Sequence, residues 1–179
     1  MSLLGTQFHG KQALAKARDL LGRELTDAEA HIAGLEGYSA SPYLDTKDVL
    51  TSGFGQTGRY LRMPLDKVVG IFEDKTRQIV PEYDNLPRDL SLRLFDSTYR
   101  GGLSGSPKTL KLINSGNWDA AADEFLNNEE FTEAVASGSG VAKRMQSTSD
   151  AMRNYARTFK DGKPSQGLLD QFMSYIGLG

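Results

Sequence analysis

The spacing of apolar residues predicts helices over most of the chain. Apolar side chains recur every three or four residues over 10–23 and again over 26–36, so each set lies on one helix face. The sequence T-D-A-E at 26–29 is typical of a capping box, and Gly37 is typical of a helix C-terminus. We expect the buried stripe of the second helix to consist of Ala28, Ile32 and Leu35.

The same periodicity returns after residue 65. It predicts a helix from Leu65 that Pro81 ends, and another whose first turn contains Pro87. Further helices are expected at 108–114, at 117–127, after Gly140, and from Ser165 onward.

Residues 38–60 have a different pattern, rich in Gly, Ser, Tyr, Thr and Val. The turn-like sequence D-T-K-D at 45–48 separates two expected strands at 43–45 and 49–54, which predicts a β-hairpin. The expected fold class is therefore α+β, mostly α-helical, with one small sheet near the N-terminus.

Composition indicates a globular protein of one domain with a small appendage. The chain has 179 residues, of which 39% are hydrophobic and 25% charged. Its net charge of −2 does not favour nucleic-acid binding. With no cysteine and two histidines, we expect neither disulfides nor a metal or other cofactor. We also expect neither a signal peptide nor a membrane span.

Charge is distributed unevenly in the second half of the chain. Residues 117–133 contain acidic but no basic side chains, whereas residues 143–163 are predominantly basic. Two solvated helix faces are one interpretation. The other is that the basic stretch helps to hold an anionic polymer.

Three residues at the predicted hairpin have the chemistry of glycoside hydrolysis. Glu36 ends a helix, Asp45 lies at the turn, and Thr51 lies in the returning strand, beside Asp45 across the hairpin. Such hydrolysis needs one protonated carboxyl group and one ionised carboxylate, and a hydroxyl can hold the attacking water. The alternative is that the three are a solvated helix end, a turn residue and a strand residue.

The segment 36–55, EGYSASPYLDTKDVLTSGFG, resembles the active-site hairpin of the phage-type lysozymes, the T-even lysozyme family of glycoside hydrolases. The resemblance continues at 83–86 (YDNL), at 109–121 (TLKLINSGNWDAA) and at 142–145 (AKRM), and covers about residues 25–160. It implies a lysozyme-like fold with a small N-terminal β-hairpin lobe and a helical C-terminal lobe. Residues 1–24 would then be a helical extension, and residues 161–179 a C-terminal helix packed on the lysozyme domain.

The resemblance also implies an activity and its residues. The protein would be a muramidase that hydrolyses the β-1,4 bonds between N-acetylmuramic acid and N-acetylglucosamine in peptidoglycan. Glu36 would be the proton donor, Asp45 the second carboxylate, and Thr51 would place the water. By the same resemblance, the glycan contacts would be Thr57, Tyr99 and Thr109. A water held by Thr51 favours inversion at the anomeric carbon.

Two positions depart from the family pattern. Gln56 stands where the family usually has a His, and we expect it to hydrogen-bond a carboxylate such as Asp74, which would connect the lobes more weakly. Glu124 stands where the family usually has an Asn that contacts the glycan, so we do not expect Glu124 to make that contact. The slightly acidic charge also predicts weak long-range attraction to an anionic wall.

The sequence leaves the biological setting open. The enzyme would either wait in the host cytoplasm for release through a separate pore, or travel in the phage virion. The expected partners are peptidoglycan glycan strands and, in the second setting, other virion proteins; we expect the isolated domain to be a monomer. A non-enzymatic module that binds peptidoglycan or belongs to a virion tail is the alternative function.

Overall fold

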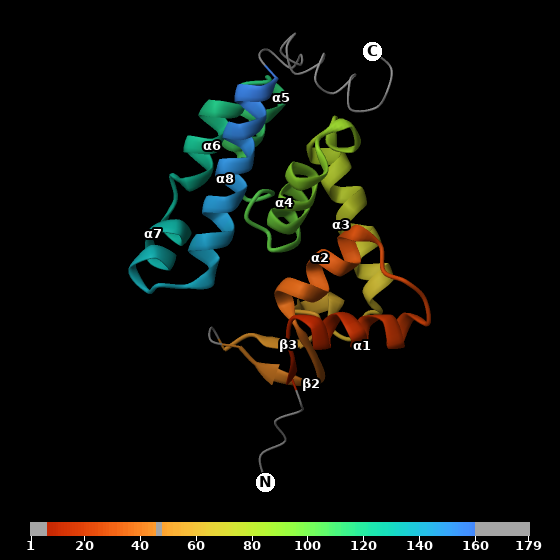
Figure 1. The fold of residues 1–179 in the computed structure, drawn as a ribbon. Coiled ribbons are helices and arrows are strands. Elements are labelled where there is room, and N and C mark those ends of the chain that lie inside the picture. The colour runs from red at the N-terminus through yellow and green to blue at the C-terminus, as the bar shows by residue number, and fades with distance from the viewer. Residues whose placement is uncertain (1–6, 46–47, 160–179) are drawn as a thin grey trace, which may run out of the picture. The chain divides into compact units, whose positions relative to one another are not determined.

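The computed structural model describes residues 7–45 and 48–159, and there it contains eight α-helices and a four-stranded sheet (Figure 1). The strands are β1 (Gln7–Phe8), β2 (Tyr38–Leu44), β3 (Leu50–Gly53) and β4 (Gln56–Thr57). The helices are α1 (Lys11–Leu21), α2 (Asp27–Glu36), α3 (Leu65–Ile79), α4 (Arg88–Tyr99), α5 (Pro107–Asn114), α6 (Trp118–Leu126), α7 (Glu129–Ala136) and α8 (Gly140–Thr158). The predicted α+β class, mostly helical with a small sheet, is confirmed. The helix expected from Ser165 lies outside the described residues.

The chain forms two compact units, Met1–Lys75 and Thr76–Gly179, and α3 runs from the first into the second. The first unit contains the sheet with α1, α2 and most of α3. The second contains α4 to α8. No helix in the described part of the chain is both long and apolar enough to cross a membrane.

The sheet of the first unit is antiparallel throughout, in the order β1-β2-β3-β4. The predicted hairpin forms the two central strands of the sheet, but β2 begins at Tyr38, whereas the sequence predicted a strand from residue 43. Its first residues pair with β1, where Gln7 lies opposite Ser39 and Phe8 opposite Tyr38. The register of β2 against β3 shifts between Ser39 and Tyr43, as in a β-bulge.

Helix α2 begins with the predicted capping box. The Glu29 amide donates to Thr26 Oγ1 at 3.2 Å, and the Thr26 amide donates to Glu29 Oε2 at 2.8 Å. The predicted buried stripe is partly wrong, because Leu35 is 43% exposed while Ala33 is fully buried. Helix α1 packs against α2, and such a contact with a separate helix is not contained in the periodicity of α2 itself.

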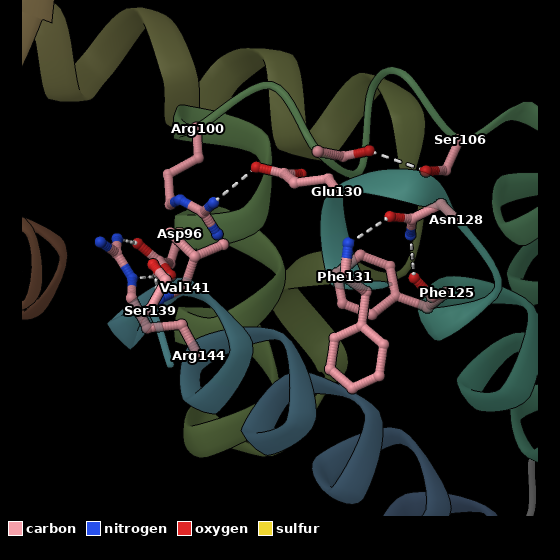
Figure 2. Close-up of polar contacts among 11 residues, drawn as sticks. Asp96, Arg100, Ser106, Phe125, Asn128, Glu130, Phe131, Ser139, Val141 and Arg144 are labelled. Atoms are coloured by element: carbon pink, nitrogen blue, oxygen red, sulfur yellow. Dashed lines mark hydrogen bonds and ion pairs between the residues drawn. The ribbon is translucent and has the colours of Figure 1, made fainter. Parts of the chain in front are cut away.

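The second unit is built around α8, which packs against α4, α6 and α7, while α5 packs against α6. The predicted apolar faces form its core, which includes Leu90, Leu94, Phe95, Trp118, Phe125, Met145, Met152 and Tyr155. Helix α7 was not predicted. It follows a cap in which Asn128 Oδ1 accepts a hydrogen bond from the Phe131 amide at 2.8 Å (Figure 2).

Ion pairs connect the basic stretch on α8 with two neighbouring helices inside the second unit. Arg144 of α8 binds Asp96 of α4, and its Nε lies 3.2 Å from Asp96 Oδ2 (Figure 2). Arg153 of α8 pairs with Asp123 of α6. Two of the basic residues of α8, Arg144 and Arg153, thus pair with neighbouring helices, which neither sequence-based interpretation of this stretch included.

Candidate active site

Glu36 is the last residue of α2 and lies in the first unit, half-buried. The chain turns from this helix into β2 at Gly37, whose φ of 72° and ψ of −170° belong to a region that essentially only glycine adopts. The direction in which Glu36 leaves the helix is therefore set by a backbone turn that other residues disfavour.

The carboxylate of Glu36 lies against the turn between β3 and β4. A methyl group on Gly55 would lie 2.7 Å from Glu36 Oε2, which is closer than any real contact of a Cβ atom. Gly55 also has a φ of +75°, in the left-handed region. Glycine at position 55 thus gives the Glu36 carboxylate the space it occupies.

Asp45 lies at the predicted hairpin turn, where its own backbone and side chain hold it. Its amide donates to the Val49 carbonyl at 3.0 Å. The Val49 amide donates in return to Asp45 Oδ1 at 2.9 Å. These two hydrogen bonds with Val49 fix the position of the Asp45 carboxylate at the turn.

Thr51 is the centre of a row of hydroxyl side chains across the sheet. It lies opposite Tyr43 of β2 and opposite Thr57 of β4, and residues that pair directly across antiparallel strands share one face. Thr51 is only 4% exposed, and its Oγ1 donates to the Val49 carbonyl at 3.1 Å. With its proton directed to the backbone, the Thr51 oxygen retains lone pairs that can accept a hydrogen bond.

The pKa of Tyr43 reflects its burial and the charges of both carboxylates. Burial, and then the charges of Asp45 and Glu36, raise the pKa of the Tyr43 phenol above its usual value. Sequence reasoning missed Tyr43 as a site residue, although its position two residues before Asp45 and across from Thr51 was a usable signal.

Gln56 lies on the opposite face of the sheet, paired with Ser52. Its Oε1 accepts from the Phe54 amide at 2.9 Å, and its Nε2 donates to the Met63 carbonyl at 2.6 Å. Gln56 thus connects the β3–β4 turn with the loop before α3. The predicted bond to Asp74 is not one of these two, and it stays a prediction.

The other two predicted glycan contacts, Tyr99 and Thr109, lie in the second unit. Tyr99 ends α4, is half-buried, and has its ring centroid 6.3 Å from that of Phe95. Thr109 is 1% exposed in α5, and its Oγ1 has no hydrogen-bond partner among the described residues. A side chain this buried needs a local movement before it can touch a ligand.

A cavity of about 570 Å³ also lies in the first unit. Its lining includes Leu20, Leu21, Ser52, Gln56, Arg62 and Met63. Ser52 and Gln56 point away from the face of Thr51 and Thr57 because side chains alternate along a strand. The cavity is therefore on the reverse side of the sheet from the row of hydroxyls.

No protein-family model matches the chain, and no curated protein shows significant similarity to it. Among the described residues, no cluster of three or more histidine, aspartate or glutamate side chains is arranged to hold a metal ion. The residues of the first unit and their geometry are therefore the features that indicate a function.

Proposed function

We propose that this protein is a muramidase of the phage lysozyme type, which cleaves the glycan strands of bacterial peptidoglycan. The observation that carries the proposal is the position of Tyr43. Tyr43 lies directly opposite Thr51 and two residues before Asp45, while the Glu36 carboxylate lies at the β3–β4 turn of the same sheet. Two carboxylates and a hydroxyl at one place are the minimum set for acid-base hydrolysis of a glycosidic bond.

Each residue has a defined role in the proposed reaction. Glu36 donates its proton to the glycosidic oxygen as the bond to the anomeric carbon breaks. Asp45, ionised and held by the Val49 amide, accepts a proton from the attacking water, whose oxygen forms the new bond. The lone pairs of Thr51 accept a hydrogen bond from that water. Attack from the face opposite the leaving group inverts the anomeric centre.

The decisive measurement is the release of reducing ends from purified peptidoglycan by the wild type and by Glu36→Gln. Loss of general-acid catalysis lowers the rate by about 10² to 10⁴-fold. Glu24→Gln is the matched control, because it makes the same change at a side chain that is 87% exposed. Proton NMR of the first-formed product gives its anomeric configuration, and inversion is expected.

Two results would count against the proposal. Unchanged reducing-end release by Glu36→Gln would remove the assigned acid. Binding of the wild type to peptidoglycan without any release of reducing ends would instead support the non-enzymatic wall-binding module.

The proposed setting is the phage infection cycle, at its end or at its start. An enzyme that reaches the wall through a separate pore would be absent from purified virions. An enzyme that opens the wall at infection would be present in them, with other virion proteins as partners. Mass spectrometry of purified particles distinguishes these two settings.

A further inference from the structure

The N-terminal segment, residues 7–23, contacts both ends of the helix that carries Glu36. This segment lies outside the part of the chain that resembles lysozymes. It consists of β1, α1 and the turn that follows, and α1 packs along α2 within the first unit (Figure 1). Ala13 and Ala17 of α1 are fully buried, and side chains this small let a helix backbone approach its neighbours closely.

At the start of α2, the contact is a pair of charge-assisted hydrogen bonds. Arg23 donates to both oxygens of Glu29, at 2.8 Å and 2.7 Å. Glu29 is also the capping-box residue of α2 and is only 3% exposed. The segment thus binds the same carboxylate that caps the first turn of the helix.

At the end of α2, the segment closes over the turn that follows Glu36. A methyl group on Gly37 would lie 2.7 Å from the Phe8 carbonyl oxygen and 2.8 Å from His9 Nδ1. Phe8 pairs with Tyr38 in the sheet, and their ring centroids are 6.1 Å apart. The Tyr38 ring in turn lies 4.9 Å from the ring of Phe54, the residue before Gly55.

These contacts are with residues next to Glu36 in the chain and in space. Phe8 and His9 pack against Gly37, the residue directly after Glu36. The row of three aromatic rings, Phe8, Tyr38 and Phe54, ends at the β3–β4 turn, against which the Glu36 carboxylate lies. We propose that residues 7–23 are a positioning element for Glu36, with Phe8 and Arg23 as its positioning residues. This inference rests on the proposed function, because it assigns Glu36 the role of general acid.

The mechanism of positioning is a restriction of the turn at residues 36–38. A general acid must be held at hydrogen-bond distance from the leaving oxygen, and small displacements reduce the rate steeply. If β1 were detached, the turn at Gly37 could adopt more conformations. The Glu36 carboxyl group would then spend less time at hydrogen-bond distance from the leaving oxygen. Residues that bind the substrate elsewhere in the chain would not be affected, so KM would not change.

The test is Phe8→Ala, with steady-state kinetics on peptidoglycan and carbon-13 NMR of the labelled Glu36 carboxyl group. We expect kcat to fall by at least about tenfold with KM unchanged, and the Glu36 resonance to shift or broaden. Phe8→Tyr keeps the ring and should restore both. Leu20→Ala is the matched control, since it truncates a large apolar side chain of the same segment that is 52% exposed.

Three outcomes separate the possibilities. A wild-type kcat and Glu36 resonance in folded Phe8→Ala would overturn the positioning role. A loss of activity in proportion to the folded fraction, with the Glu36 resonance of the folded part unchanged, would also overturn it. If the wild type releases no reducing ends, the proposed function fails, but the carboxyl resonance still reports whether the segment positions Glu36.

Discussion

At the scale of residues, the candidate site depends on positions without side chains as much as on the carboxylates. Gly55 leaves the space that Glu36 fills, and Gly37 permits the turn directly after it. Both have positive φ, and both would bring a Cβ atom within 3 Å of neighbouring atoms. The geometry of the acid is therefore encoded partly by glycines, whose role at these positions is steric and conformational.

Gly55→Ala should lower kcat by displacing the Glu36 carboxylate. The new methyl group would lie 2.7 Å from Glu36 Oε2, and the side chain must rotate away to accommodate it. The matched control is Gly58→Ala, which has a φ of +52° but no atom within 4 Å of the added methyl group. Both variants should lose about 1 kcal/mol of stability from the strained backbone. Only Gly55→Ala should lose activity beyond that, and equal kcat values for the two would refute the steric argument.

At the scale of elements, an ion pair with a buried carboxylate connects two segments in each unit. In the first unit, the Glu29 carboxylate receives two bonds from Arg23 and one from the Thr26 amide. In the second, Asp96 of α4 is buried and paired with Arg144 of α8 (Figure 2). A buried charge that loses its partner is costly, so each pair makes one arrangement of its helices preferable to others.

Glu29→Gln should destabilise the first unit and change its response to acid. Hydrogen bonds, first from Arg23 and then from the Thr26 backbone, lower the pKa of Glu29 below its ordinary value of 4.5. The stabilisation is therefore present above pH 4.5 and is lost as the pH falls through the lowered pKa. At pH 7 the variant should lose about 1–3 kcal/mol, measured by amide hydrogen exchange in α2. Below the lowered pKa it should approach the wild type, whereas Glu24→Gln should match the wild type throughout.

Arg144→Met should destabilise the second unit more strongly. The change leaves the Asp96 carboxylate buried without its cation, at a cost of about 3–5 kcal/mol. The single tryptophan, Trp118, is buried in this unit, so its fluorescence follows urea unfolding there. Arg157→Met is the control on the same helix, because Arg157 hydrogen-bonds the exposed Arg153 carbonyl and Asn154 side chain. A loss below about 1 kcal/mol would show that the pair is not structurally important.

At the scale of the whole molecule, the net charge determines how the protein would be attracted to or repelled by the proposed anionic substrate. The net charge is −2, and the basic residues Arg144 and Arg153 of α8 are paired with acids of neighbouring helices. Neither residue offers an unpaired cation for polymer capture. If peptidoglycan is the substrate, as proposed, we expect its recognition to depend on short-range contacts in the site more than on long-range attraction.

The rate of peptidoglycan hydrolysis should not fall when salt is raised from about 10 mM to about 150 mM, over which the screening length shortens from about 30 Å to about 8 Å. Salt weakens attraction between opposite charges, and here the protein has the same sign as the wall. A double variant, Glu24→Lys with Glu133→Lys, moves the net charge from −2 to +2, because each replacement adds two positive charges. It should acquire a rate that decreases with salt. A several-fold decrease for the wild type would show that a local basic surface dominates.

Several features could be predicted because neighbours in sequence determine them. Helix α2 and its cap follow from a period of apolar residues and from T-D-A-E, and the hairpin follows from its turn sequence. The pairing of Tyr43 with Thr51 across β2 and β3 is a consequence of that hairpin. Local hydrogen bonds and side-chain alternation act over a few residues, so the sequence by itself contains them.

Other features depended on contacts between distant residues. The two-residue strand β1 has no periodicity of its own, and it exists because Tyr38 and Ser39 lie beside it. The exposure of Leu35 follows from where α1 packs, and the hydrogen bonds of Gln56 follow from how the loop at Met63 folds back. The sequence thus determined the hairpin, the helices other than α7, and the chemistry available at Glu36, Asp45 and Thr51. Only the tertiary structure decided which backbone turns and which distant segment surround Glu36, because packing energy is shared among residues that the chain order does not bring together.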